Sequence, residues 1–348
     1  MVLEVVYVKT ASNAQVRRHN EALVRQVLLE RREATRQQLA RETGLSLMTV
    51  GNLLSVMQEK GEVQVQGSVP SEGGRPSARY RYRGEEHKVA AMHLYHLEGR
   101  DQARLAVYDL FGDAVYRDGE SMEEFRPEVL DRLLARTFER VPGIRGIALG
   151  LPGQVDHGEL VYCDHPVLVK EAIPRRWEYF YGVPVRPAND IDAAMLGYVQ
   201  SLAPGKSLGL TAGFYFPQGV LPGMGLVLEG RPWPGHRGFV GEFHFLPPRF
   251  GWGDLDYRDH AAMEQVVAQV VSGACVYVAP DRVVLYGDFF RYGAAGRIQA
   301  LVEECFHGLY GLELEIRRDL GPDYEMGMQA LALDQLKGTL FGKEGEDL

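Results

Sequence analysis

Apolar residues recur with a helical period between residues 35 and 57. Thr35 and Gln38 have the spacing of a capping box at the start of a first helix, and Gly44 can end that helix because glycine accepts a positive φ. Ser46 can then cap a second helix. The apolar residues of this second helix fall at i, i+3, i+4 and i+7, on one inward face: Val50, Leu53, Leu54 and Met57. The pattern predicts two short helices joined by a tight turn, and the alternative is an ordinary helical hairpin.

The outward face of the second helix has the composition of a helix that enters a DNA major groove. It carries Met48, Gly51, Asn52 and Ser55. Asn52 or Thr49 is expected to read bases, because both follow the cap within two turns and Asn can bond adenine through both amide atoms. The candidate DNA contacts from the helix pair are Thr35, Ser46, Met48, Thr49 and Asn52.

Two segments that alternate between polar and apolar residues follow the helix pair, at residues 62–66 and 78–83, and alternation is the period of a strand. The stretch 67–77 between them is rich in Gly, Ser and Pro and is expected to be a loop. A helix pair followed by such a hairpin is a winged helix-turn-helix.

Arginines give the predicted wing its chemistry. Arg75 follows two glycines and precedes a proline, so it can bring a cation into a narrow, A·T-rich minor groove. Arg79 and Arg81, together with Arg83, fall at alternate positions and share one strand face, where phosphates can lie. The alternative is a basic hairpin whose charges only face solvent.

Charge is unevenly distributed along the chain. Residues 1–86 hold 13 Lys and Arg against 10 Asp and Glu, a net of +3, whereas the whole chain has 38 against 47, a net of −9. The remainder therefore carries −12, which fits a DNA-reading module joined to a part that does not bind nucleic acid. Because +3 is a small excess, binding to double-stranded DNA is expected to need two copies on a two-fold operator, from a homodimer or homotetramer.

Length and composition fit a cytoplasmic globular protein. The 348 residues are enough for two or three compact units, and 45% apolar and 24% charged residues are ordinary values. No apolar run approaches the roughly 20 residues of a membrane helix. The N-terminus lacks the pattern of a secretory signal. The three scattered cysteines argue against a disulfide framework.

From residue 88 the pattern becomes α/β. Strands are expected at 89–95, 103–110, 114–117, 143–151, 183–188, 207–216, 225–229 and 283–286. Helices are expected at 127–141, 191–202, 261–271, 296–307 and 326–336. Groups of strands followed by helices, twice over, predict a two-lobed body with a cleft between the lobes. The expected divisions are an N-terminal arm (1–15), the winged helix-turn-helix (16–86), a first lobe (87–205), a second lobe (206–336) and a flexible tail (337–348).

Several short motifs occur in a recognisable order: Gly73–Pro76, Asp109–Gly112, Gly150–Gly153, Asn189–Asp190 with Ala193–Ala194, and Gly235–Glu242. From about residue 20 to 336 the chain thereby resembles the ROK family, named for repressors, open reading frames and sugar kinases. The resemblance implies an α/β chain in which an N-terminal winged helix-turn-helix precedes a two-lobed actin-like body, of the ribonuclease H-like sugar-kinase kind. The winged-helix members of the family resemble repressors of sugar-utilisation genes.

Departures from the family pattern concern phosphate binding. ROK kinases receive ATP phosphates on an Asp-x-Gly-Gly-Thr turn, which aligns here with Leu97–Asp101, a segment with two acids and one glycine. A second glycine-rich phosphate loop aligns with Phe216–Gly225, where Pro217 and Pro222 remove N–H donors. These departures imply that the chain binds no nucleotide cofactor and has no catalytic residues.

Sugar-binding positions of the family are partly retained. Asp190 matches the catalytic base of the kinases, and Asn189, Glu242 and Asp256 match other contacts to sugar hydroxyls, which implies a small sugar effector. The alternative for Asp190 is a helix N-cap with Asn189 in the turn, and the alternative for Glu242 is a surface acid. Phe245 takes the place of the histidine in the family's Glu-x-Gly-His motif, which narrows the expected pocket.

The zinc motif of the family is also absent. The matching stretch, residues 249–256, keeps Gly251 and Gly253 but holds no cysteine, so no metal is expected. The resulting prediction is a repressor of carbohydrate-related genes whose kinase-like body serves oligomerisation and sugar sensing. Two alternatives stay open: an active ATP-dependent sugar kinase, and a regulator whose body no longer binds sugar.

Overall fold

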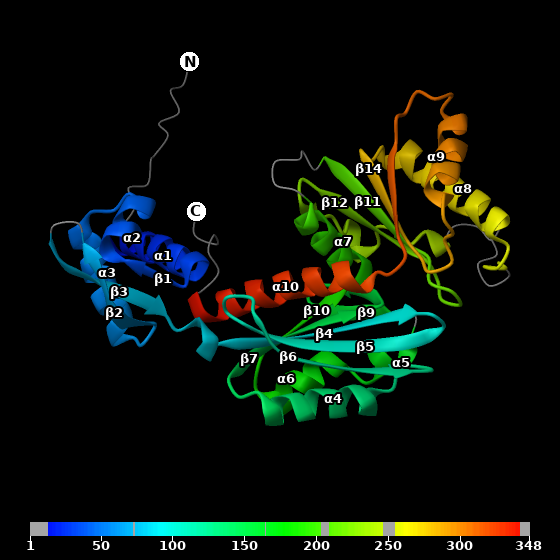
Figure 1. The fold of residues 1–348 in the computed structure, drawn as a ribbon. Coiled ribbons are helices and arrows are strands. Elements are labelled where there is room, and N and C mark those ends of the chain that lie inside the picture. Colours follow the sequence, from blue (N-terminus) through cyan, green and yellow to red (C-terminus); the bar gives the residue numbers. More distant parts are fainter. Residues whose placement is uncertain (1–12, 72–73, 164, 203–208, 246–254, 342–348) are drawn as a thin grey trace, which may run out of the picture. The chain divides into compact units, whose positions relative to one another are not determined.

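The structure is a computed structural model that describes residues 13–71, 74–163, 165–202, 209–245 and 255–341 (Figure 1). The chain divides into two compact units. Unit 1 comprises residues 1–87 with the short turn 109–113, and unit 2 comprises residues 88–108 and 114–348.

Unit 1 begins with helices and ends in a hairpin. Its elements are α1 (Asn13–Arg31), β1 (Glu33–Thr35), α2 (Arg36–Thr43), α3 (Leu47–Glu59), β2 (Val63–Ser71) and β3 (Gly74–Tyr82). The three strands form an antiparallel sheet in the order β1-β3-β2. A short 3₁₀ helix, η1 (Gly84–Glu86), follows.

The helix boundaries in unit 1 follow from local capping. The backbone N–H of Gln38 donates to Thr35 Oγ1 at 3.3 Å, and the Gln38 side chain accepts from Thr35 N–H at 2.8 Å. Gly44 has φ of 72°, and the N–H of Thr49 donates to the side chain of Ser46 at 3.1 Å. The predicted inward face of α3 is buried: Val50, Leu53, Leu54 and Met57. The predicted capping box, turn and second helix are thus confirmed.

The wing differs from the prediction in one respect. Residues 67–77 were expected to form a loop, but β2 and β3 extend through most of them, to a last pair between Ser71 and Gly74. Register shifts after Val65 and Val69 let the ladder continue past Gly67, because a bulge absorbs residues that do not alternate. Gly73, the start of the family motif in the wing, lies outside the described residues.

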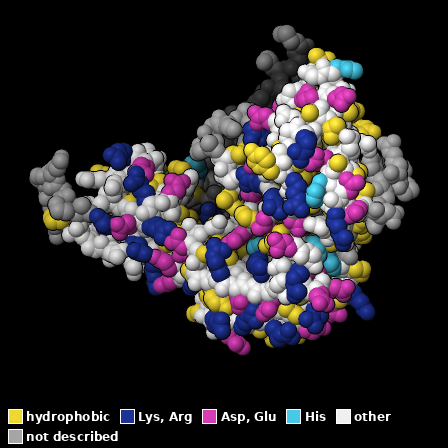
Figure 2. Space-filling view, turned by 45° about the vertical axis from the view of Figure 1, so that its right-hand side comes forward, with side chains coloured by type: hydrophobic (Ala, Val, Ile, Leu, Met, Phe, Trp, Pro, Cys, Tyr) yellow, Lys and Arg dark blue, Asp and Glu magenta, His cyan; other side chains and the backbone are white. Residues whose placement is uncertain are grey.

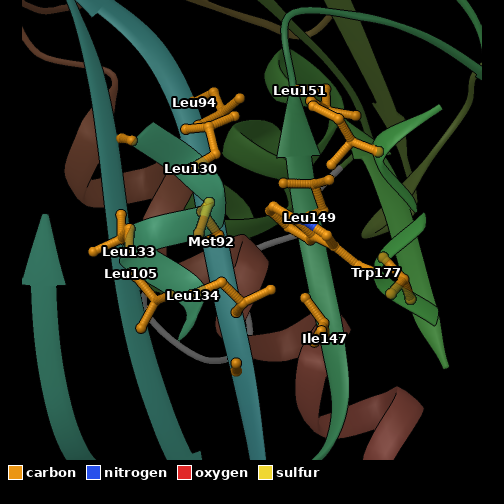
Figure 3. Packing of buried hydrophobic residues seen from close by; sticks show 14 of the residues in the cluster. Met92, Leu94, Leu105, Leu130, Leu133, Leu134, Ile147, Leu149, Leu151 and Trp177 are labelled. Carbon is orange, nitrogen blue, oxygen red and sulfur yellow. The ribbon is translucent and has the colours of Figure 1, made fainter. Parts of the chain in front are cut away.

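The first lobe of unit 2 is a five-stranded sheet covered by helices. Its sheet contains β4 (Lys88–Leu97), β5 (Arg100–Asp109), β6 (Ala114–Met122), β7 (Ile144–Leu151) and β10 (Val185–Asn189). Helices α4 (Pro127–Arg140), α5 (Pro166–Lys170) and α6 (Ile173–Tyr181) accompany it, with a hairpin of β8 (Gly153–Asp156) and β9 (Glu159–Cys163). Figure 3 shows the core, where Leu130 and Leu134 of α4 lie among strand residues such as Met92, and Trp177 of α6 lies beside Leu149. The apolar stripe of α4 is therefore buried as predicted, whereas the hairpin, α5 and α6 were not predicted.

The second lobe repeats this plan. Its sheet contains β11 (Leu210–Tyr215), β12 (Gly223–Leu228), β13 (Arg231–Pro232), β14 (Arg282–Tyr286) and β15 (Glu313–Arg317). Helices α8 (His260–Val278) and α9 (Ala294–Cys305) accompany this sheet, with short 3₁₀ turns η2 (His236–Gly238) and η3 (Phe243–Phe245). Two further helices of unit 2 are α7 (Asp190–Ser201) and α10 (Gly321–Phe341). The strand orders are β6-β5-β4-β7-β10 and β13-β12-β11-β14-β15. Counted from the first strand of each lobe, both sheets read 3-2-1-4-5, so the two-lobed architecture that the resemblance implied is present.

Helices α7 and α10 cross between the two sheets (Figure 1). A Cβ on Gly197 would overlap the carbonyl oxygen of Asp323, and a Cβ on Gly327 would overlap the carbonyl oxygen of Ala193. The two helices therefore approach each other with backbone against backbone. Because α10 also packs on β4 and β7, the last helix of the chain returns to the first lobe. This corrects the prediction that residues 206–336 belong to the second lobe throughout.

One helix among the described residues, α8, is long and apolar enough to cross a membrane by length and composition, with a mean hydropathy of 1.3. Five of its residues are buried in the core of the second lobe: Met263, Val267, Ala268, Val271 and Cys275. That packing is typical of a core helix in a globular protein.

Acidic and basic side chains are interspersed over the face of unit 2 that Figure 2 shows.

Candidate functional site

The first half of α3 presents an exposed surface in unit 1. Met48 has 78% of its surface exposed and Leu47 has 51%. Large apolar side chains at a helix start that packed against the rest of the unit would be buried. Asn52 is exposed, and Thr49 is half-buried with its hydroxyl 2.9 Å from that of Ser46. The residues predicted to meet the major groove on α3 therefore share one accessible surface.

Thr35 does not belong to this surface. Its side chain is buried, with 8% of the residue exposed, and it caps α2. The prediction that Thr35 contacts DNA is corrected for this reason, since its hydroxyl is already used by the backbone of α2.

The wing arginines are engaged in ion pairs. Arg79 Nη1 lies 2.7 Å from Glu33 Oε1, Arg81 pairs with Glu85, and Arg83 pairs with Glu86. These side chains are 33–41% exposed, so a phosphate can approach them but must compete with a carboxylate. The backbone of Arg75 lies in β3, and its side chain lies outside the described part of the chain.

In unit 2, a pocket of about 720 Å³, including solvent at its mouth, lies at the N-terminal end of α7. Asn189, Asp190 and Glu242 line it, as the resemblance implied. Asp256 does not line it: this residue is exposed, and its carboxylate accepts the N–H of Arg258. Other lining residues come from the first lobe, the β8–β9 hairpin and the second lobe, including His96, Phe125, Tyr162, His165, Tyr215 and Met224.

Asn189, not Asp190, caps α7. The side-chain oxygen of Asn189 accepts the N–H of Asp192 at 2.9 Å, and its amide donates to the carbonyl of Gly153 at 2.8 Å. Asp190 is the first residue of the helix, and only 8% of it is exposed. The alternative that Asp190 is the N-cap is therefore wrong. The N-terminus of α7 places the Asp190 carboxylate in the pocket near Tyr215, and burial together with Asp190 raises the pKa of Tyr215.

A pair of carboxyl groups, those of Asp192 and Glu242, lies in the same pocket. Burial and the neighbouring Glu242 raise the pKa of Asp192 to about 7. A Cβ on Gly225 would lie 3.3 Å from Asp192 Oδ1, which places this carboxyl against β12. Asp192 was not predicted, because its partner is 50 positions away and the resemblance matches only Asn189 and Asp190 before it.

Two histidines, His96 and His165, line another wall of the pocket, and both lie close to the buried carboxylate of Asp101. Asp101 is 2% exposed; its Oδ1 lies 2.9 Å from His96 Nδ1, and its Oδ2 accepts the N–H of Phe125 at 2.9 Å. His165 Nδ1 lies 4.0 Å from the same carboxylate. Asp101 is the residue that the resemblance aligns with the threonine of the family's phosphate turn. Neither histidine was predicted.

Both segments that align with phosphate loops are tied to one carboxylate. Asp288 Oδ2 accepts the backbone N–H of Glu98 at 3.1 Å, and Asp288 Oδ1 accepts from the amide of Gln218 at 2.7 Å. Pro217 and Pro222 line the pocket and offer no N–H. The backbone N–H of Glu98 is therefore bonded to an acid of the protein itself.

Among the described residues, no group of three or more His, Cys, Asp or Glu side chains is placed to hold a metal ion. Cys163 and Cys275 are buried, and Cys305 is exposed. Gly251 and Gly253, in the stretch that aligns with the zinc motif, lie outside the described residues.

Comparisons with known proteins agree with this geometry. No family model matches the chain. The xylose repressor of Caldicellulosiruptor bescii is 22% identical over 301 residues, which cover 82% of this chain and 73% of that protein. A crystal structure of a ROK family transcriptional regulator, a homolog of the E. coli MLC protein, superposes with a TM-score of 0.64 at 18% identity and covers 94% of this chain and 98% of its own. The ROK hexokinase from Thermus thermophilus gives a TM-score of 0.52 at 21% identity and covers 70% of this chain and 98% of its own.

These matches confirm the resemblance to the ROK family and its repressors. The fold is a winged helix-turn-helix followed by an actin-like body of the ROK kind.

Proposed function

We propose that this chain, which resembles ROK family repressors in sequence and in fold, is a cytoplasmic, sequence-specific DNA-binding repressor of carbohydrate-related genes. The observation that carries the proposal is the exposed start of α3, the second helix of a capped helix-turn-helix, where Met48 is 78% exposed. A helix held in this way by its neighbours presents its N-terminal residues to a major groove. The xylose repressor similarity supports a carbohydrate-related set of genes.

The body is proposed to sense a small sugar through the pocket at α7. Asn189, Asp190 and Glu242 supply amide and carboxylate groups that accept and donate hydrogen bonds to hydroxyls. The aromatic and aliphatic lining, with Phe125, Tyr215 and Met224, suits the apolar faces of a sugar ring. Asp256 is left out of this proposal because it does not line the pocket.

We propose further that the body transfers no phosphate. Asp288 occupies the N–H of Glu98 and the amide of Gln218, and prolines replace donors in the second loop. The kinase alternative has one observation in its favour, since Asp190 sits in the pocket at the start of α7 as a base would. Asp190 can bind a hydroxyl, but a base without a held nucleotide has no phosphoryl group to direct the hydroxyl toward.

Selection of duplexes from a random-sequence pool, followed by quantitative binding to the enriched sequence, tests the DNA-binding function. We expect a two-fold sequence bound by a homo-oligomer, with half-sites spaced by about one helical turn. Calorimetry with a panel of unphosphorylated sugars then tests the pocket, using Asp190→Asn as the variant. DNA binding without any sugar binding would favour a regulator whose body serves only as a scaffold, and enrichment of no duplex would refute the proposal.

A further inference from the structure

Most cations of unit 1 are paired with acids. Among the Lys and Arg whose side chains are described there, nine lie within 4.0 Å of a carboxylate: Arg17, Arg25, Arg31, Arg32, Arg41, Lys60, Arg79, Arg81 and Arg83. Two described cations have no such pair, Arg18 on α1 and Arg36 at the start of α2. Of these two, Arg36 is the one that lies against the exposed helix α3.

Arg36 is held in place by two other elements. Its Nη2 donates to the hydroxyl of Tyr80 on β3 at 3.1 Å, and Tyr80 is itself 6% exposed. Its guanidinium crosses α3 at Gly51, where an added Cβ would lie 3.3 Å from both Cζ and Nη1 of Arg36. One exposed cation therefore touches α2, α3 and the wing strand together.

Gly51 is explained by this contact. A glycine inside a helix is unfavourable relative to alanine, and position 51 is on the outward face of α3, where a larger side chain would otherwise fit. The guanidinium of Arg36 fills the space that a side chain at position 51 would take. The arginine therefore lies against the face of α3 that carries Met48 and Asn52.

We propose that Arg36 binds a DNA backbone phosphate beside the major groove and thereby fixes the position of α3 on the duplex. Its contacts with Tyr80 and Gly51 hold the guanidinium in place before DNA binds. Contacts to phosphates position a protein on the duplex without reading its sequence. An arginine with no carboxylate partner can make this contact without first giving up an ion pair, unlike Arg79 and Arg81. The inference rests on the proposed DNA-binding function.

The test measures binding of the full chain to the duplex that the wild type enriches from a random pool, and to an unrelated duplex of the same length, over a range of salt. Arg36→Ala is expected to weaken binding to both duplexes by about tenfold or more and to leave their ratio unchanged. The slope of log K against log salt should become shallower by about 0.9 for each copy that contacts a phosphate. Arg36→Lys should keep most of the slope because it keeps the charge. Arg41→Ala, on the exposed side of the same helix, is the matched control and should change none of these quantities.

Gly51→Ala gives a second measurement that does not remove the charge. Alanine favours the helix, so thermal unfolding should be unchanged or shifted upward, while DNA binding weakens because Arg36 is displaced. Tyr80→Phe should weaken binding in the same direction. An Arg36→Ala variant that matches Arg41→Ala in affinity and slope would overturn this inference alone. A wild type that enriches no duplex would overturn the proposed function and this inference with it.

Discussion

Asp288 accepts a hydrogen bond from the backbone N–H of Glu98, a residue 190 positions earlier in the chain, at 3.1 Å. Glu98 lies in the turn between β4 and β5, and Asp288 follows β14, so the bond joins the two lobes of unit 2. The other oxygen of Asp288 accepts from Gln218, in the loop before β12. A carboxylate of the protein thus takes a hydrogen-bond donor from each of the two segments that the sequence aligned with phosphate loops.

The first prediction is that Mg²⁺ and ATP leave the melting temperature unchanged. A nucleotide needs converging N–H groups and cations, and here acids stand at Glu98, Asp101 and Asp288. A ligand present at 100 times its Kd would stabilise the fold by about 2.7 kcal/mol, which thermal unfolding resolves easily. An active ATP-dependent sugar kinase serves as the positive control. A rise in melting temperature with ATP, together with sugar phosphate among the products, would contradict this prediction and support the alternative of an active sugar kinase.

The second prediction concerns base reading by α3. Asn52→Ala should weaken binding to the enriched duplex by about 1–3 kcal/mol and affect an unrelated duplex much less, since a base contact carries the specificity. Gln58→Ala, exposed at the far end of the same helix, is the control. Methylation of major-groove sites should interfere with binding. Indifference to such methylation would remove the major-groove assignment.

The third prediction concerns the tip of the wing. Arg75→Ala should weaken binding to the enriched duplex by about 1–3 kcal/mol, because a cation beside glycines and a proline suits a narrow minor groove. The loss should be largest on duplexes with A·T pairs at the affected position, which substituted duplexes can measure. If Arg75→Ala binds as tightly as Arg41→Ala at matched salt, the wing does not enter the minor groove.

The fourth prediction is a pH dependence that originates at Asp192. Its pKa is about 7 in the folded chain against an ordinary 3.8, so folding favours the protonated form. The stability that this group contributes is fully present below about pH 4 and is lost as the pH rises through 7. Asp192→Asn should therefore gain stability relative to wild type across this range, by at most about 4 kcal/mol.

Urea unfolding at several pH values measures this difference. Glu123→Gln, at an exposed position between β6 and α4, is the control and should show no such trend. Glu242→Gln should lessen the pH dependence, because one of the two causes of the raised pKa is removed. A constant difference between Asp192→Asn and wild type from pH 4 to 7 would contradict the assignment.

The sequence predicted those features that depend on interactions between residues close together in the chain. The caps at Thr35 and Ser46, the turn at Gly44 and the buried face of α3 depend on residues within a few positions of one another. The order of strands in both lobes could be expected only through the resemblance to the ROK family, because periodicity does not give the pairing of strands.

What the sequence missed depends on contacts between distant segments. Asp192 meets Glu242, and Asp288 meets Glu98, at separations that no local pattern encodes. The sequence predicts a DNA contact at Thr35 because a capping residue looks the same in sequence whether its side chain is exposed or buried. The role of Arg36 was missed because its neighbours, Gly51 and Tyr80, become neighbours only when α2, α3 and β3 pack.

The last prediction tests the crossing of α7 and α10, which places Asp190 in the pocket. Gly327 and Gly338 both lie in α10, but an added Cβ would overlap the backbone of α7 at Ala193 in the first case and meet nothing within 4 Å in the second. Gly338→Ala should stabilise the chain by about 0.5–1 kcal/mol, since alanine is the better helix former. Gly327→Ala should instead destabilise it by about 2 kcal/mol or more, because backbone cannot move aside as a flexible side chain can. Urea unfolding of both variants gives the comparison, and sugar calorimetry then shows whether the pocket is disturbed only in the Gly327 variant. Two variants of equal stability would mean that the helices do not pack as closely as the two glycines indicate.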